Sequence, residues 1–190
     1  MYTIEELEKY CLRCHKCRLS ETRTNVVFGE GNENADIMFV GEGPGYNEDM
    51  HGRPFVGKAG QLLDKMIEAI RLKRSDVYIA NIVKCRPPDN RNPLEDESNA
   101  CLDYLRWQVK LVQPAIIVCL GAVAAKNLIN PDMSISRERG KFSKKGSIYF
   151  MPTYHPSYLL RNELAKKDAW EDFKKIAAKL EELKQQKEEI

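Results

Sequence analysis

The sequence predicts a three-layer α/β/α sandwich with a central four-stranded parallel sheet. Four short segments are apolar on both faces, and such segments form strands that are covered by helices on each side. The stretches between them are long enough for the crossover helices that join parallel strands. A length of 190 residues suits one domain, so we expect residues 1–190 to form a single domain.

The expected strands are short apolar runs, three of which stop at a Gly or a Pro: 37–40, 77–83, 115–120 and 148–151. Helical periodicity predicts the connecting helices at 61–70 and 100–111, and a shorter one at 121–129. The tail over 174–190 is rich in Lys, Glu, Leu and Gln, and a closing helix is expected over about 165–188. Its apolar residues recur at helical spacing and would pack on the domain: Ile176, Leu180 and Leu183.

Composition excludes several classes of protein. Lys and Arg number 30 and Asp and Glu 28, so a formal net charge of +2 offers no overall basic surface for nucleic acid. Any binding of DNA must therefore use a local patch. No apolar run reaches the roughly 18 residues of a transmembrane helix, and the opening MYTIEELEKY is acidic where a signal peptide is basic. We therefore expect no membrane association and a cytoplasmic location.

The segments after the expected strands should hold the functional site. In open parallel sheets, ligands bind at the carboxyl ends of the strands. The segments that follow the strands there are 41–55, 81–92 and 153–161, and they are unusual in composition. The first opens with Gly41-Glu42-Gly43-Pro44-Gly45, which is neither a dinucleotide-binding fingerprint nor a Walker sequence, so binding of a nucleoside triphosphate is not expected.

Six cysteines in a chain without an export signal favour metal ligation or burial over disulfides. Cys119 lies within an apolar strand and is expected to be structural. The other five offer four sulfur ligands: Cys11, Cys14, Cys17, Cys85 and Cys101. Spacing leaves the first pair open, since Cys14 can pair with Cys11 or with Cys17, and zinc and an iron-sulfur cluster both accept four thiolates.

Four motifs occur together in a fixed order: GEGPG with Glu48 after it, Gly52-Arg53-Pro54-Phe55-Val56-Gly57, Asn81-Ile82-Val83-Lys84-Cys85-Arg86-Pro87-Pro88, and His155-Pro156-Ser157-Tyr158-Leu159-Leu160-Arg161. This set resembles the family 4 uracil-DNA glycosylases over about 14–161. The resemblance implies excision of uracil in base excision DNA repair. It also implies a [4Fe-4S] cluster held by Cys14, Cys17, Cys85 and Cys101, with Cys11 as an extra thiol.

The chemistry of uracil excision assigns roles to the motif residues. An amide at Asn81 can donate to uracil O4 and accept from N3–H, whereas cytosine offers the reverse pattern. Phe55 would stack on the base, and His155 would stabilise the uracil anion at O2 as it leaves. Backbone N–H groups of the loop that contains Gly41 and Gly43 can add further donors.

The carboxylates and Asn90 complete the expected catalytic set. Family 1 glycosylases carry a water-positioning Asp where this chain has Gly43, so catalysis must depend on the leaving group and on a cation-like sugar. Glu42, aided by Asn90, would order water or oppose that cation. Glu48 resembles the residue that lies near uracil C5, where it would exclude the methyl group of thymine.

The expected DNA surface surrounds the same loops. By resemblance, Leu159 would fill the gap left by the flipped base, with Leu160 as the close competitor. The basic residues expected to bind phosphates are Arg86, Arg91 and Arg161, with Lys84 nearby. No lysine is placed for a Schiff base, so we expect a monofunctional glycosylase. A monomer is expected, and contact with a sliding clamp stays open.

Two other functions are compatible with the cysteine set. One is a noncatalytic, metal-stapled DNA-binding module of the same fold, against which the presence of Phe55, Asn81 and His155 counts. The other is a zinc-containing hydrolase that acts on free nucleotides. Release of uracil from an oligonucleotide distinguishes the three.

Overall fold

The structure, a computed structural model, describes residues 3–188 and contains the predicted parallel sheet. The strand order is β1-β3-β2-β4-β6-β5, and the four central strands are parallel. Their bounds are β2 Ile37–Gly41, β3 Tyr78–Asn81, β4 Ile116–Leu120 and β6 Ile148–Thr153. The three-layer α/β/α architecture with a central four-stranded parallel sheet is therefore confirmed.

Two short strands extend the sheet at its edges, and the sequence did not predict them. β1 (Glu30–Gly31) pairs antiparallel with β3, and β5 (Ser143–Lys145) pairs antiparallel with β6. Both are too short and polar to produce an apolar run. β5 also explains how Pro152 fits in a strand, because β5 pairs only as far as Phe150 and leaves the backbone beyond it without a β5 partner.

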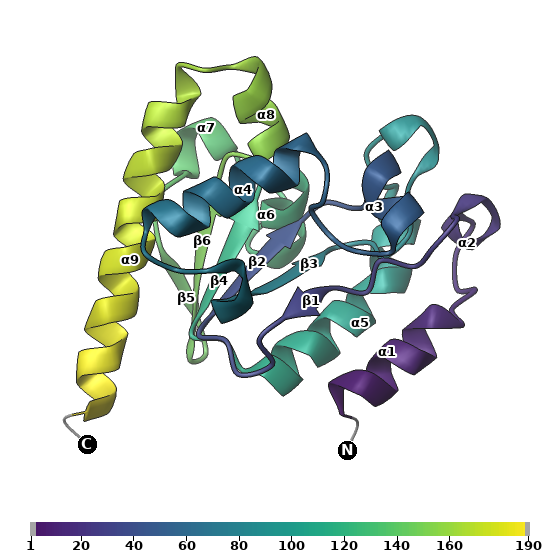
Figure 1. Ribbon diagram of the computed structural model, residues 1–190, viewed down its shortest axis with the longest axis horizontal. Coiled ribbons are helices and arrows are strands. Elements are labelled where there is room, and N and C mark those ends of the chain that lie inside the picture. Colours follow the sequence, from purple (N-terminus) through teal and green to yellow (C-terminus); the bar gives the residue numbers. More distant parts are fainter. Residues whose placement is uncertain (1–2, 189–190) are drawn as a thin grey trace.

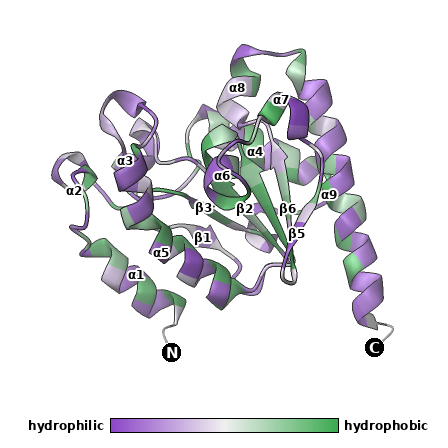
Figure 2. Ribbon diagram, turned by 180° about the vertical axis from the view of Figure 1, so that it is seen from behind, coloured by the Kyte–Doolittle hydropathy of each residue, from purple (hydrophilic) through white to green (hydrophobic). Residues whose placement is uncertain are grey.

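Helices cover both faces of the sheet (Figures 1 and 2). Along β2, Met38 and Val40 face one apolar core, and Ile37 and Phe39 face the other, as strand alternation requires. One core lies under α1 (Ile4–Leu12), α5 (Glu95–Val112) and α6 (Ala122–Leu128). The other lies under α4 (Lys58–Ala69) and α9 (Ala165–Glu188).

The remaining helices are short and lie in the connections: α2 Leu19–Thr22, α3 Tyr46–His51, η1 Arg74–Asp76, η2 Pro88–Asn90, α7 Ile135–Glu138 and α8 Pro156–Arg161. Helices α4 and α5 begin earlier than periodicity predicts. In α5 the first turn is Glu95-Asp96-Glu97, whose charges suit a helix N-terminus but carry no apolar signal. The predicted helix at 100–111 therefore misses the acidic first turn.

The closing helix α9 packs on the sheet as its sequence pattern predicts. Ile176 and Leu180 are buried in the core beneath it, and Leu183 packs at its margin. The last two residues of the chain lie outside the described part. Within residues 3–188, no helix combines the length and apolar character needed to cross a membrane.

The parallel pairing brings the functional loops to one edge of the sheet. Gly41 at the end of β2 lies beside Asn81 at the end of β3, and Leu120 at the end of β4 lies beside Thr153 of β6. The chain leaves β2 toward β3 on one side and crosses to β4 on the other, which creates the switch point where such sheets bind ligands. In Figure 1 the central parallel strands, such as β2 and β4, point toward the side where α3 and α8 lie.

Candidate functional site

A cavity of about 710 Å³ opens at the carboxyl edge of the sheet. This volume falls within the usual range of about 300–1,000 Å³ for small-molecule sites. Most of the predicted site residues line it: Glu42, Gly43, Glu48, Phe55, Asn81, Asn90, Arg91, His155 and Arg161. They come from the loops after β2, β3 and β6, so the fold brings together residues that lie more than 100 positions apart.

The floor of this cavity depends on Gly41. A Cβ atom there would lie 2.5 Å from Asn81 Oδ1 and 2.6 Å from Phe55 Cζ, so no side chain fits. Glycine therefore lets the carboxamide and the phenyl ring approach each other across the end of β2. The strand pairing fixes this approach, because the Gly41 carbonyl accepts the backbone N–H of Ile82 at 2.9 Å.

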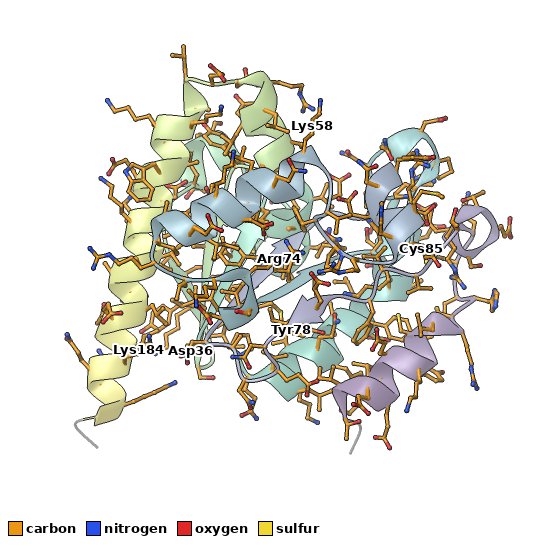
Figure 3. All side chains as sticks on the ribbon, viewed as in Figure 1. Asp36, Lys58, Arg74, Tyr78, Cys85 and Lys184 are labelled. Carbon is orange, nitrogen blue, oxygen red and sulfur yellow. The ribbon has the colours of Figure 1, made fainter. Side chains whose placement is uncertain are left out.

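Phe55 forms a wall of the cavity in a constrained backbone conformation. Its φ of 51° lies in the left-handed region that residues other than glycine rarely adopt. Arg74 holds this segment by donating to the carbonyls of Pro54 and Phe55. The Arg74 guanidinium is itself fixed at 2.8 Å from both Glu30 and Asp64 (Figure 3).

Arg74 is a site residue that the sequence did not indicate. It lies in η1, outside every motif, and nothing in its neighbours distinguishes it from a solvated arginine. Gly60 supports the same segment from α4, because a Cβ atom there would collide with the Phe55 carbonyl. The stacking wall is therefore anchored from two separate elements.

Asn81 ends β3 with its side chain inside the protein. The residue is 1 % exposed, and Oδ1 has no hydrogen-bond partner. Leaving a buried acceptor unpaired costs about 1–3 kcal/mol, so native proteins rarely keep one without a reason. A ligand that donates to Oδ1 would remove this cost.

His155 and Phe55 both line the cavity and their rings are in contact, with centroids 5.6 Å apart and planes tilted by 31°. As the N-cap of α8, its Nδ1 accepts the backbone N–H of Ser157 at 3.1 Å. That bond requires an unprotonated Nδ1, so the ring proton is assigned to Nε2. Burial, together with the charge of Arg161 and against that of Glu48, lowers the pKa of His155 to about 4. The imidazole is therefore neutral at pH 7 and has Nε2–H free to donate.

Glu48 connects two loops of the cavity. One carboxylate oxygen accepts the backbone N–H groups of Val56 and Gly57, both at 2.9 Å. The other accepts the N–H of Gly45 at 3.1 Å, at the start of α3. This fixed geometry keeps Glu48 in the cavity lining, where the sequence predicts it, and adds a loop-holding role that sequence alone did not indicate.

Glu42 and Asn90 also line the cavity, in the segments after β2 and β3. Burial raises the pKa of the Glu42 carboxyl group above its usual value. Asn90 has a left-handed φ of 54°, and its Oδ1 accepts from Arg86 Nε at 2.7 Å.

The uracil DNA glycosylase superfamily model matches residues 28–175, a span that includes every lining residue named above. A type-4 uracil-DNA glycosylase of Sulfurisphaera tokodaii is 48% identical over 93% of this chain and 84% of its own length. Those of Archaeoglobus fulgidus and Thermotoga maritima are 43% and 48% identical, over 93% and 85% of this chain and 92% and 88% of their own lengths. The chain belongs to the type-4 uracil-DNA glycosylases. The family resemblance of its motifs is therefore confirmed.

The basic residues at the mouth of the type-4 site differ in their availability. Arg161 lines the cavity, and Arg86 lies beside the mouth with its guanidinium 5.2 Å from the centroid of the Tyr46 ring. Arg91 makes a two-pronged ion pair with buried Glu97 at 2.7 and 2.8 Å. Lys84 was expected near the surface, but it is only 1 % exposed, so that expectation is wrong.

The two adjacent leucines of α8 face opposite environments. Leu159 is 1 % exposed and lies outside the cavity lining, whereas Leu160 is 43 % exposed. Neighbouring residues on a helix point about 100° apart, and here α8 packs against α4. The predicted insertion of Leu159 into DNA does not suit this burial, and Leu160 takes its place as the candidate.

Five cysteines surround a second, small cavity: Cys11, Cys14, Cys17, Cys85 and Cys101. It lies where the segment after α1 meets the start of α5, and Figure 3 shows Cys85 on that side of the molecule. Two N–H donors point at sulfur, Arg23 at Cys85 and the Lys84 backbone at Cys101, both at 3.3 Å. Such donors stabilise thiolates, as metal ligation requires.

The cysteine side chains are not arranged around one common centre. Within residues 3–188, no three His, Cys, Asp or Glu side chains are grouped to hold one metal ion. A zinc ion would need its sulfurs at about 2.3 Å from one centre. A cubane cluster gives each cysteine a different iron and so keeps the sulfurs further apart. None of the six cysteines, all of which lie within residues 3–188, forms a disulfide.

Proposed function

We propose that the cavity binds a uracil flipped out of DNA and that the chain hydrolyses its N-glycosidic bond, leaving an abasic site. Membership of the type-4 family makes the chain a DNA-repair glycosidase. The observation that carries the assignment of the site is the unpaired Asn81 Oδ1, buried beside Phe55. Uracil N3–H can donate a hydrogen bond to this oxygen, whereas cytosine N3 carries no hydrogen and cannot.

Leaving-group stabilisation is the main catalytic effect in this proposal. Cleavage places negative charge on uracil O2, and the neutral His155 donates Nε2–H to it. Because Ser157 holds Nδ1, the donor is oriented before the reaction begins. Phe55 stacks on the base without selecting among bases, and the hydrogen bonds of Asn81 provide the selectivity for uracil.

Glu42 acts on the sugar side of the bond. Its half-buried carboxylate opposes the positive charge that develops on the deoxyribose, or orders the attacking water with Asn90. An aspartate at position 43 would not substitute for it easily. A Cβ atom at Gly43 would lie 2.7 Å from Val83 Cγ2, so Val83 would have to move.

The cysteine cavity is proposed to hold the [4Fe-4S] cluster through Cys14, Cys17, Cys85 and Cys101. The five cysteines around it are enough to supply the four thiolates of such a cluster, and fully buried Cys11 is the extra thiol. The cluster supplies four metal–sulfur bonds that join the N-terminal segment to α5. Arg86 and Arg161 are proposed to bind DNA phosphates, and Arg91 to hold the loop through Glu97.

Incubation with a uracil-containing oligonucleotide, followed by alkali, tests the function. Strand cleavage at the uracil position is expected, with none for the same oligonucleotide carrying thymine or cytosine. DNA binding without cleavage by iron-loaded protein would instead support the noncatalytic module. Hydrolysis confined to free nucleotides would support the zinc hydrolase.

The leucine pair of α8 gives a prediction with a built-in control. Leu160→Ala should slow excision from double-stranded DNA several-fold, because nothing then fills the gap left by the base, and should affect single-stranded DNA little. Leu159→Ala removes a buried side chain instead and should lower stability by about 2–5 kcal/mol. Excision rates on both DNA forms and thermal unfolding of both variants separate these effects. Equal slowing on single and double strands by Leu160→Ala would contradict the insertion role.

A further inference from the structure

Lys84 is a buried cation placed between the base cavity and the cysteine cavity. Its Nζ donates to the Asn81 carbonyl at 2.9 Å and to Gln108 Oε1 at 2.6 Å. Its backbone N–H donates to Cys101 Sγ at 3.3 Å. Lys84 also lines the cysteine cavity and is followed in the chain by Cys85. One residue thus contacts both candidate sites.

Gln108 is fixed so that it can only accept from Lys84. Its Nε2 donates to the Phe28 carbonyl at 2.9 Å and to Tyr78 Oη at 3.2 Å, which leaves Oε1 for the ammonium group. Gln108 is fully buried and lies two turns after Cys101 on α5, on the same face of the helix. Figure 3 labels Tyr78, which is at the far end of this buried chain of contacts.

The charge of Lys84 has no carboxylate partner among residues 3–188. Both acceptors of its Nζ are neutral oxygens, and no ion pair includes it. Buried charges in proteins are normally paired or bound at metal sites. The side chains of Cys101, Cys11 and Cys85 line the same small cavity as Lys84. Metal ligation makes such sulfurs anionic and so supplies the missing negative charge.

We infer that Lys84 is a positioning residue that joins the cysteine centre to base recognition. Its ammonium group neutralises the ligating thiolates, and its hydrogen bond to the Asn81 carbonyl fixes the turn from which the Asn81 amide faces uracil. The inference rests on the proposed function for its second half. The part of the inference that concerns neutralisation of the thiolates by Lys84 does not depend on the proposed function.

The test compares two buried variants of the iron-loaded protein. Lys84→Met keeps the length of the side chain and removes its charge and donors. Tyr78→Phe is the matched control, because it removes a hydroxyl group from the same buried chain without touching Lys84. For each, we would measure iron per protein, the midpoint potential of the cluster, the affinity for free uracil, and kcat and KM on a single-stranded uracil oligonucleotide.

Lys84→Met should shift the cluster potential to more negative values, since losing a nearby positive charge disfavours adding an electron. It should also weaken uracil binding and raise KM by about tenfold, the usual effect of losing one hydrogen bond to a charged group, with a smaller change in kcat. Tyr78→Phe should leave the potential and the uracil affinity as in the unchanged protein. A folded Lys84→Met variant with unchanged potential and unchanged uracil affinity would overturn the inference.

Lys84→Arg keeps the inference testable if the methionine variant does not fold. It retains the charge but moves the donor away from the Asn81 carbonyl, so the potential should stay unchanged while uracil binding weakens. The opposite pattern would overturn the inference. Failure of the proposed function would show differently, as absence of uracil binding and excision in the unsubstituted protein.

Discussion

Asn81→Leu should lower kcat/KM for uracil excision by between about 30-fold and 10⁴-fold. The substitution leaves uracil O4 and N3–H buried without partners, and each unpaired group costs about 1–3 kcal/mol. Leucine has the same number of side-chain heavy atoms as asparagine and the same branch at Cγ, so the outline of the side chain between Gly41 and Phe55 is kept while its polar atoms are lost. Single-turnover excision at saturating and subsaturating enzyme measures the effect.

The control for Asn81→Leu is binding of uracil-free DNA, which should not change. The unpaired Oδ1 also predicts the direction of the stability effect. Because the native oxygen is buried without a partner, the variant should unfold at a temperature no lower than the unchanged protein. Excision at the original rate would remove Asn81 from base recognition.

His155→Phe should reduce the single-turnover rate by about 10²- to 10³-fold, the usual effect of removing one preorganised donor to a developing anion. The effect should fall on the chemical step more than on binding, because the phenyl ring can still pack against Phe55. Uracil affinity measured separately provides the comparison. A variant that binds uracil poorly but cleaves bound substrate at the normal rate would contradict this role.

The same histidine gives a pH dependence of known sign. Its pKa is lowered to about 4 in the folded protein, so the unfolded chain binds the proton more tightly. Its contribution to stability is therefore complete above about pH 6.5, the ordinary pKa of histidine, and is lost as the pH falls toward 4. The unfolding temperature of the unchanged protein should drop more between these pH values than that of His155→Phe. Because the imidazole stays neutral down to about pH 4, the excision rate of the unchanged protein should show no step near pH 6.5 caused by His155.

The central sheet and the location of the site were predictable because both depend on local patterns. Apolar runs mark β2, β3, β4 and β6, and the unusual segments follow them at the edge where parallel strands place ligands. The edge strands β1 and β5 carry no such pattern, since they are held only by pairing with their neighbours. Their existence depends on tertiary structure.

Side-chain direction was the part that sequence did not determine. Leu159 and Leu160 are chemically identical neighbours, and only the packing of α8 on α4 decides which one is buried. Lys84 resembles a surface lysine until the turn after β3 directs it inward to Gln108. Arg74 acts through a guanidinium that reaches carbonyls 19 and 20 positions away in the chain.

The anchoring of Phe55 by Arg74 and Gly60 affects how the enzyme tolerates heat. The segment that carries the Phe55 ring packs closely on α4 and is held through Arg74 to the ion pairs with Glu30 and Asp64. Fraying of one surface loop therefore leaves the ring in place. The ability to hold the base should persist on warming until the sheet and its helices melt together, so inactivation and global denaturation share one transition.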